Sequence, residues 1–103
     1  MSVVDEEIFG PVVCAIPFKE LDEVATQMNQ TSYGLAGAIW TRDVSKAHRL
    51  ARAMRAGTVW INCYNIFDAT LPFGGYKQSG WGREMGKEVL EHYTEVKSIV
   101  VKV

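Results

Sequence analysis

The sequence predicts a three-layer α/β fold, a βαβαβ unit with a parallel sheet, followed by a separate terminal strand. Short apolar runs alternate with amphipathic helical patterns, the last nine residues are rich in β-branched side chains, and 103 residues leave room for one small domain. Strands that alternate with helices are typical of parallel sheets with crossover helices. We therefore expect one unit over residues 1–94 and a strand over residues 95–103 that pairs with a strand of another chain.

The first half of the chain supplies two strand candidates and one helix candidate. Residues 11–18 form an almost continuous apolar run that contains Pro11 and Pro17, which predicts a buried strand. Residues 20–30 show the helical repeat of apolar positions, and residues 35–40 supply a second strand candidate. The apolar stripe of the helix consists of Leu21, Val24, Ala25 and Met28.

The next helix and strand have clear boundary signals. Asp43 is a good N-cap for a helix that reaches Ala56, where Gly57 is expected to end it. Its apolar stripe consists of Val44, Ala47, Leu50, Ala51 and Met54. Residues 58–62 then read as the third strand.

A long irregular segment precedes the C-terminal elements. Prolines and glycines interrupt every periodic pattern between residues 63 and 82, and long loops inside small domains are usually functional. Residues 83–93 predict a last helix, with Gly86 allowing a close approach to another element. Residues 95–103 carry apolar side chains on both faces, so we expect them to pair with another chain.

Composition and charge exclude several classes of protein. Hydrophobic residues make up 48% and charged residues 22%, as in globular domains, and the formal net charge is −1. The basic residues of 42–55 are interpreted as a solvated helix face, so we expect no nucleic-acid partner.

The sequence also shows no signal for export or for insertion into a membrane. Residues 1–10 hold acids where an export signal needs bases, and no apolar stretch could span a bilayer. We expect a cytoplasmic protein without a membrane partner.

Motif searches give no independent catalytic or metal site. Cys14 and Cys63 lack the spacing of a zinc or dithiol motif. Cys14 is expected to be a buried, inert thiol. Cys63 lacks a neighbouring histidine in the sequence that could activate it as a nucleophile. His48 and His92 have no ligand at metal-binding spacing. The glycines of 74–86 match neither the dinucleotide fingerprint nor the P-loop, which disfavours an unrelated nucleotide-binding domain.

Three segments carry a family resemblance. Residues 6–12 (EEIFGPV), 57–62 (GTVWIN) and 72–80 (PFGGYKQSG) resemble, in this order, segments of the NAD(P)-dependent aldehyde dehydrogenase superfamily. The resemblance covers essentially the whole chain and corresponds to the C-terminal end of a member's catalytic domain. It implies oxidation of an aldehyde to a carboxylic acid, by thiolate attack on the carbonyl, hydride transfer to the cofactor and hydrolysis of the thioester.

The resemblance also implies roles for four residues. Glu7 matches the glutamate that hydrogen-bonds the nicotinamide ribose, and Phe9 matches an aromatic residue beside the nicotinamide. Phe67 and Phe73 match positions that line the aldehyde tunnel. A solvated acid at Glu7 and ordinary core packing of the three phenylalanines are the alternatives. Residues 65–70 lack the acidic and Trp arrangement associated with quaternary-ammonium aldehydes, so a neutral aromatic or aliphatic aldehyde is expected.

The resemblance implies that this chain alone is inactive. The family's nucleophilic cysteine and general-base glutamate precede the EEIFGPV segment, so no catalytic residue is assigned here. NAD or NADP would bind the full-length parent rather than this chain. Homo-oligomers are expected through residues 95–103. A truncated product, a split gene and a proteolytic core remain open as origins, and an inert oligomerisation or interaction module is the alternative function.

Overall fold

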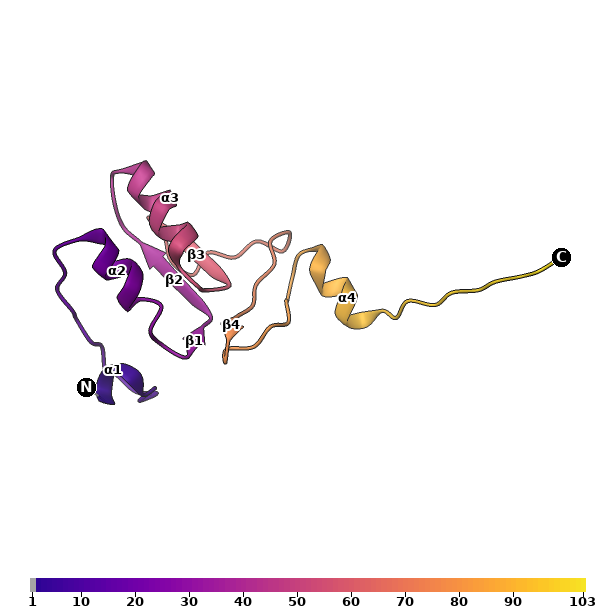
Figure 1. Ribbon diagram of the computed structural model, residues 1–103, viewed down its shortest axis with the longest axis horizontal. Coiled ribbons are helices and arrows are strands. Elements are labelled where there is room, and N and C mark those ends of the chain that lie inside the picture. Colours follow the sequence, from indigo (N-terminus) through magenta and orange to yellow (C-terminus); the bar gives the residue numbers. More distant parts are fainter. Residues whose placement is uncertain (1) are drawn as a thin grey trace.

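The computed structural model describes residues 2–103 and has an elongated shape. The Cα radius of gyration is 18.3 Å and the extents are 70 × 32 × 23 Å, whereas a compact chain of this length has a radius of about 13 Å. Figure 1 shows an α/β body on one side and, beyond α4 (Leu90–Tyr93), a tail that runs away from it. Few hydrophobic side chains are therefore buried; among the described residues they are Ile39, Ala47, Leu50 and Trp60.

A βαβ unit forms the centre of the body. Strands β2 (Ala36–Ile39) and β3 (Thr58–Ile61) are parallel, and the register aligns each residue of β2 with the residue at the same place in β3. Helix α3 (Val44–Ala53) connects them and contacts both. The predicted strand–helix–strand order of this region is confirmed.

Helix α3 begins as predicted and ends earlier. The Asp43 carboxylate accepts a hydrogen bond from the Lys46 backbone N–H at 3.0 Å, which is an N-cap. The helix ends at Ala53 instead of Ala56, so Gly57 is not its stop signal. Asn29 explains the early end, because its side chain donates to the Ala53 carbonyl at 2.8 Å and accepts from the Arg55 N–H at 2.8 Å.

Helix α2 (Leu21–Gln27) confirms the first predicted helix and packs on α3. The four positions of its predicted stripe are half-buried, while the positions between them are exposed. The 3.6-residue period therefore reports correctly which face of this helix turns inward.

The predicted strand over residues 11–18 is wrong for this chain. The segment has no strand pairing and is exposed, with Val13 91% exposed. Pro11 and Pro17 cannot donate backbone hydrogen bonds, and no strand of the described chain lies beside the segment to pair with it. The parallel sheet of the described residues accordingly has two strands, β2 and β3, instead of three.

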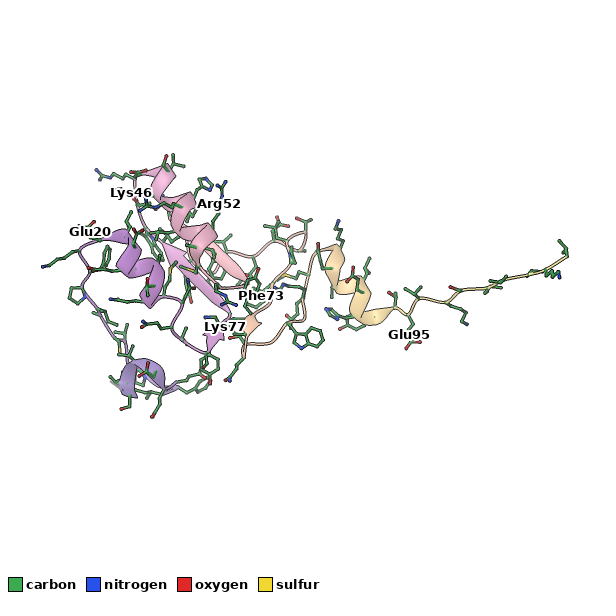
Figure 2. All side chains as sticks on the ribbon, in the orientation of Figure 1. Glu20, Lys46, Arg52, Phe73, Lys77 and Glu95 are labelled. Carbon is green, nitrogen blue, oxygen red and sulfur yellow. The ribbon has the colours of Figure 1, made fainter. Side chains whose placement is uncertain are left out.

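A second, antiparallel ladder was not predicted. Strand β1 (Tyr33–Gly34) pairs with β4 (Tyr76–Lys77), which lies inside the segment expected to be an irregular loop. The Lys77 ammonium donates to the carbonyls of Asn29 and Thr31, each at 2.9 Å. These hydrogen bonds fix the loop to the body beside β1, where Figure 2 labels Lys77.

The last helix is shorter than predicted. The backbones of Phe73 and Glu84 form a bridge with two hydrogen bonds of 2.7 Å, so residue 84 is extended rather than helical. Met85 and Gly86 then have positive φ angles of 59° and 61°, which no right-handed helix allows. Helical structure begins only at η1 (Lys87–Val89) and continues into α4.

The two ends of the described chain differ. A short helix, α1 (Ser2–Asp5), precedes the exposed segment and was not predicted. Residues 95–103 are extended and unpaired, and Val96, Val100 and Val103 are almost fully exposed. Their pairing with a partner stays a prediction. Within residues 2–103, no helix has the length and hydrophobicity needed to cross a bilayer.

Candidate functional site

The carboxyl end of β3 leads into a cluster of aromatic rings. Trp60 contacts Tyr64 and Phe67 edge to face, with centroids 5.1 and 5.6 Å apart. Phe67 in turn contacts Phe73 at 5.1 Å with an interplanar angle of 86°. The structure therefore brings together Phe67 and Phe73, the two residues predicted to line a substrate tunnel. Trp60, which was not singled out, is the buried anchor between them and the sheet.

Local hydrogen bonds fix the loop that carries this cluster. The Trp60 indole N–H donates to the Ile66 carbonyl at 2.8 Å. The Asp68 carboxylate accepts from the Thr70 backbone N–H at 2.8 Å and from the Thr70 hydroxyl at 2.6 Å. These two hydrogen bonds lower the pKa of Asp68 from its usual value. The carboxylate is consequently ionised at neutral pH.

Two glycines allow the second half of the loop to approach the sheet. A Cβ at Gly57 would collide with the Gly74 carbonyl, and one at Gly74 would collide with the Gly82 carbonyl. Backbone lies where a side chain would otherwise project, so only glycine fits. The close approach brings Phe73, beside Gly74, to the amino-terminal end of β3.

A pocket of about 240 Å³ opens between β3 and the loop. Its lining includes the rings of Trp60, Phe67 and Phe73, the Cys63 thiol, Leu71 and Asp68. Thr58 also lines it, and its hydroxyl oxygen is buried without a hydrogen-bond partner. An apolar wall with few polar groups is the usual composition of a small-molecule site.

The two predicted cofactor residues lie elsewhere. Glu7 and Phe9 belong to the exposed segment between α1 and α2, and the Phe9 side chain is 93% exposed with a φ of 52°. Figures 1 and 2 show this N-terminal region on the far side of the body from Phe73. Within the described chain, the predicted residues thus form two separate groups.

The two cysteines lie in different surroundings. Cys14 is exposed, so the expected buried thiol is wrong, for the same reason that the 11–18 strand is wrong. Cys63 is partly buried and lines the aromatic pocket, and the described residues lining that pocket include no histidine.

Sequence reasoning missed Asn62, which ties the carboxyl ends of the two parallel strands together. Its side-chain oxygen accepts from the Thr41 N–H and its amide donates to the Thr41 carbonyl, both at 2.9 Å. Asn62 has a φ of 54°, a left-handed conformation that asparagine tolerates better than most residues. An asparagine as the last residue of the strand predicted over residues 58–62 was the available signal.

Comparison with known proteins agrees with this architecture. Residues 1–99 match the model of the aldehyde dehydrogenase family. The mitochondrial aldehyde dehydrogenase of Homo sapiens is 53% identical over 103 residues, which is 100% of this chain and 20% of that protein. The NAD+ complex of an aldehyde dehydrogenase from Bacillus cereus superposes with a TM-score of 0.92 at 53% identity, covering 100% of this chain and 21% of that one.

A third similar structure is betaine aldehyde dehydrogenase from Staphylococcus aureus in complex with NAD+, with a TM-score of 0.86 at 50% identity. It covers 90% of this chain, which spans 18% of that structure. The chain thus spans about a fifth of the length of the relatives that it matches. A match over nearly every residue, at more than half identity and with the same fold, shows that this chain belongs to the aldehyde dehydrogenase family.

Proposed function

We propose that this chain is the C-terminal part of an NAD(P)-dependent aldehyde dehydrogenase that oxidises an aldehyde to a carboxylic acid. Family membership over the whole chain, at a fifth of the relatives' length, carries the proposal. The sheet agrees with it, because β2 and β3 leave the apolar segment 11–18 uncovered. In the longer protein that segment would complete the three-stranded sheet of the predicted three-layer unit, within a catalytic-domain part spanning residues 1–94.

Glu7 and Phe9 suit one wall of the cofactor site. The Glu7 carboxylate is exposed and makes no hydrogen bond within the described chain, so both of its oxygens can accept from the vicinal hydroxyls of a ribose. The exposed Phe9 ring can pack against a flat heteroaromatic group. NAD+ or NADP+, when bound, would accept a hydride from the aldehyde carbon. One exposed wall gives little burial, so we expect no cofactor affinity in the isolated chain.

Phe67 and Phe73 would supply one wall of the substrate site. Phe67 packs perpendicular to Trp60 and Phe73 packs perpendicular to Phe67, which fixes the rings before any ligand arrives and lowers the entropic cost of binding. Apolar rings also exclude water from the bound aldehyde. The chain itself would contribute positioning and no nucleophile.

The exposed tail supports a second role in assembly. Residues 95–103 present unpaired backbone and exposed apolar side chains, both of which strand pairing with another copy would satisfy. We propose homo-oligomer formation through this strand. An inert oligomerisation module is the alternative to a part of an enzyme, and the free thiols of Cys14 and Cys63 are consistent with a reducing, cytoplasmic setting for either.

Absorbance of the reduced cofactor tests the enzymatic proposal. The pure 103-residue chain should reduce neither NAD+ nor NADP+ with any aldehyde, whereas a longer protein that contains this chain should do so. The intact mass of the source protein distinguishes the two materials, since the chain alone has 11.5 kDa. Turnover by the isolated chain that is abolished in Cys63→Ala would overturn the assignment of no catalytic residue.

A further inference from the structure

The ammonium group of Lys77 joins the loop of residues 63–82 to the ends of two helices. It donates to the carbonyls of Asn29 and Thr31, each at 2.9 Å, just beyond the end of α2. The Asn29 side chain in turn makes two hydrogen bonds of 2.8 Å to the backbone at the end of α3. A cation is favourable at the carboxyl end of a helix, because the carbonyl dipoles point toward it. Lys77 thus connects the loop to both helices.

The backbone at Lys77 adopts a strained conformation that needs support from its surroundings. Its φ is 55°, in the left-handed region that a residue with a Cβ avoids. Strand β4 is only two residues long and pairs with two residues of β1, which is too short a ladder to be stable by itself. Strained residues persist where other contacts enforce them. The two hydrogen bonds of the ammonium group supply this support, and they are strong because the donor is charged.

Phe73 is the residue of the aromatic wall that depends on this anchor. Gly74 and Gly75 separate it from β4 and carry no side chain that could hold this part of the loop. The backbone of Phe73 forms its bridge with Glu84, which belongs to the chain between β4 and η1, so the bridge does not fix Phe73 to the sheet. Toward the carboxyl end of the loop, the chain from Phe73 is next fixed to the body at β4, where Lys77 supplies the charged hydrogen bonds.

We propose that Lys77 is a positioning residue that sets the place of Phe73 in the substrate wall, and thereby determines how tightly the site binds an aldehyde large enough to touch that ring. This inference rests on the proposed function, because it takes the aromatic pocket as part of the aldehyde site. Lys77 is not among the described residues that line the pocket, so it acts through the backbone of the loop and not on the substrate.

Lys77→Met tests the role of the ammonium group. Methionine keeps an unbranched side chain and the same backbone restriction but lacks the donors, so any effect reports the lost hydrogen bonds. Two aldehydes are compared in the longer enzyme that contains this chain: benzaldehyde has a ring that can pack on Phe73, and acetaldehyde has only a methyl group. We expect KM for benzaldehyde to rise about tenfold, KM for acetaldehyde to change less than about twofold, and kcat to stay unchanged, because the lost contact is remote from the reacting carbonyl. An equal loss for both aldehydes would mean that Lys77 serves only the fold and would overturn the proposal.

A conservative variant and a matched control sharpen this result. Lys77→Arg keeps a charged donor and should hold KM for benzaldehyde within about threefold of the native value. A rise as large as in Lys77→Met would overturn the role of the charged hydrogen bonds. Lys46→Met makes the same chemical change at an exposed α3 residue, away from Lys77 in Figure 2 and outside the pocket, and should change neither KM. The same loss in this control would assign the effect to general surface charge and refute the proposal.

A structural measurement on the 103-residue chain separates this proposal from the function on which it rests. The rings of Phe67 and Phe73 have centroids 5.1 Å apart, close enough for nuclear Overhauser contacts between their protons. These contacts should weaken in Lys77→Met and persist in Lys77→Arg and Lys46→Met. That result would support the positioning role even if no aldehyde were oxidised, in which case the enzymatic function alone would fail. Unchanged ring contacts in Lys77→Met would overturn the proposal, whatever the turnover.

Discussion

Replacing Asn62 tests whether one side chain joins the ends of the parallel strands next to the aromatic pocket. Its amide exchanges two hydrogen bonds with the backbone of Thr41, each 2.9 Å long, and its φ is 54°. Asn62→Ala removes both hydrogen bonds and forces alanine into a left-handed conformation. Asn62→Gly removes the same hydrogen bonds but tolerates the backbone angle.

The expected loss of stability follows from these two contributions. A hydrogen bond contributes about 0.5–1.5 kcal/mol net, and Asn62 is exposed, so two bonds at the lower end give about 1–2 kcal/mol. The left-handed conformation costs a residue with a Cβ about 1 kcal/mol more. We expect Asn62→Ala to lower the free energy of unfolding by about 2–3 kcal/mol, and Asn62→Gly by about 1 kcal/mol less than that.

Urea unfolding followed by tryptophan fluorescence provides the measurement, because Trp60 lies at the centre of the affected region. Asn62→Asp is a third variant that keeps the acceptor and the size but places an oxygen opposite the Thr41 carbonyl, so it should also destabilise. Equal midpoints for the native protein and all three variants would refute the role of the hydrogen bonds. Equal stability of the alanine and glycine variants would refute the backbone contribution.

Three other predictions concern the core, the cofactor wall and the tail. Leu50→Ala should lower the free energy of unfolding by about 2–3 kcal/mol, because Leu50 is 8% exposed. Val44→Ala, at a position 67% exposed on the same helix, should lower it by less than about 1 kcal/mol. Comparable losses in the two variants would contradict the packing of α3. In the longer enzyme, Glu7→Gln should weaken cofactor binding about tenfold or more by removing charge-assisted hydrogen bonds, each worth about 1.5–3 kcal/mol. Unchanged cofactor affinity and turnover would remove Glu7 from the site. Deleting residues 95–103 should convert the oligomer to a smaller species in light scattering, whereas a monomer both before and after deletion would disprove assembly through the tail.

Elements whose partners are close in sequence could be predicted, and those with distant or external partners could not. The stripe of α2 and the Asp43 cap of α3 are local signals, and both helices begin where these signals indicate. The β1–β4 ladder joins residues more than 40 positions apart and has two residues in each strand, too few to show a period. The bridge between Phe73 and Glu84 likewise overrides the helical pattern of residues 83–86 through contacts that the pattern does not contain.

The same reasoning explains the uneven outcome for the site. Phe67 and Phe73 meet because the loop between them folds back on β3 within the chain, through the Trp60 indole and the Gly57–Gly74 approach. Glu7 and Phe9 have no such contacts, since they flank the apolar segment 11–18, which no strand of this chain covers. A hydrophobic pattern reports that a segment gains free energy from burial, but it does not supply the surface that buries it. The exposure of residues 11–18 therefore supports the proposal that a longer protein buries this segment, which lies next to Glu7 and Phe9 in the sequence.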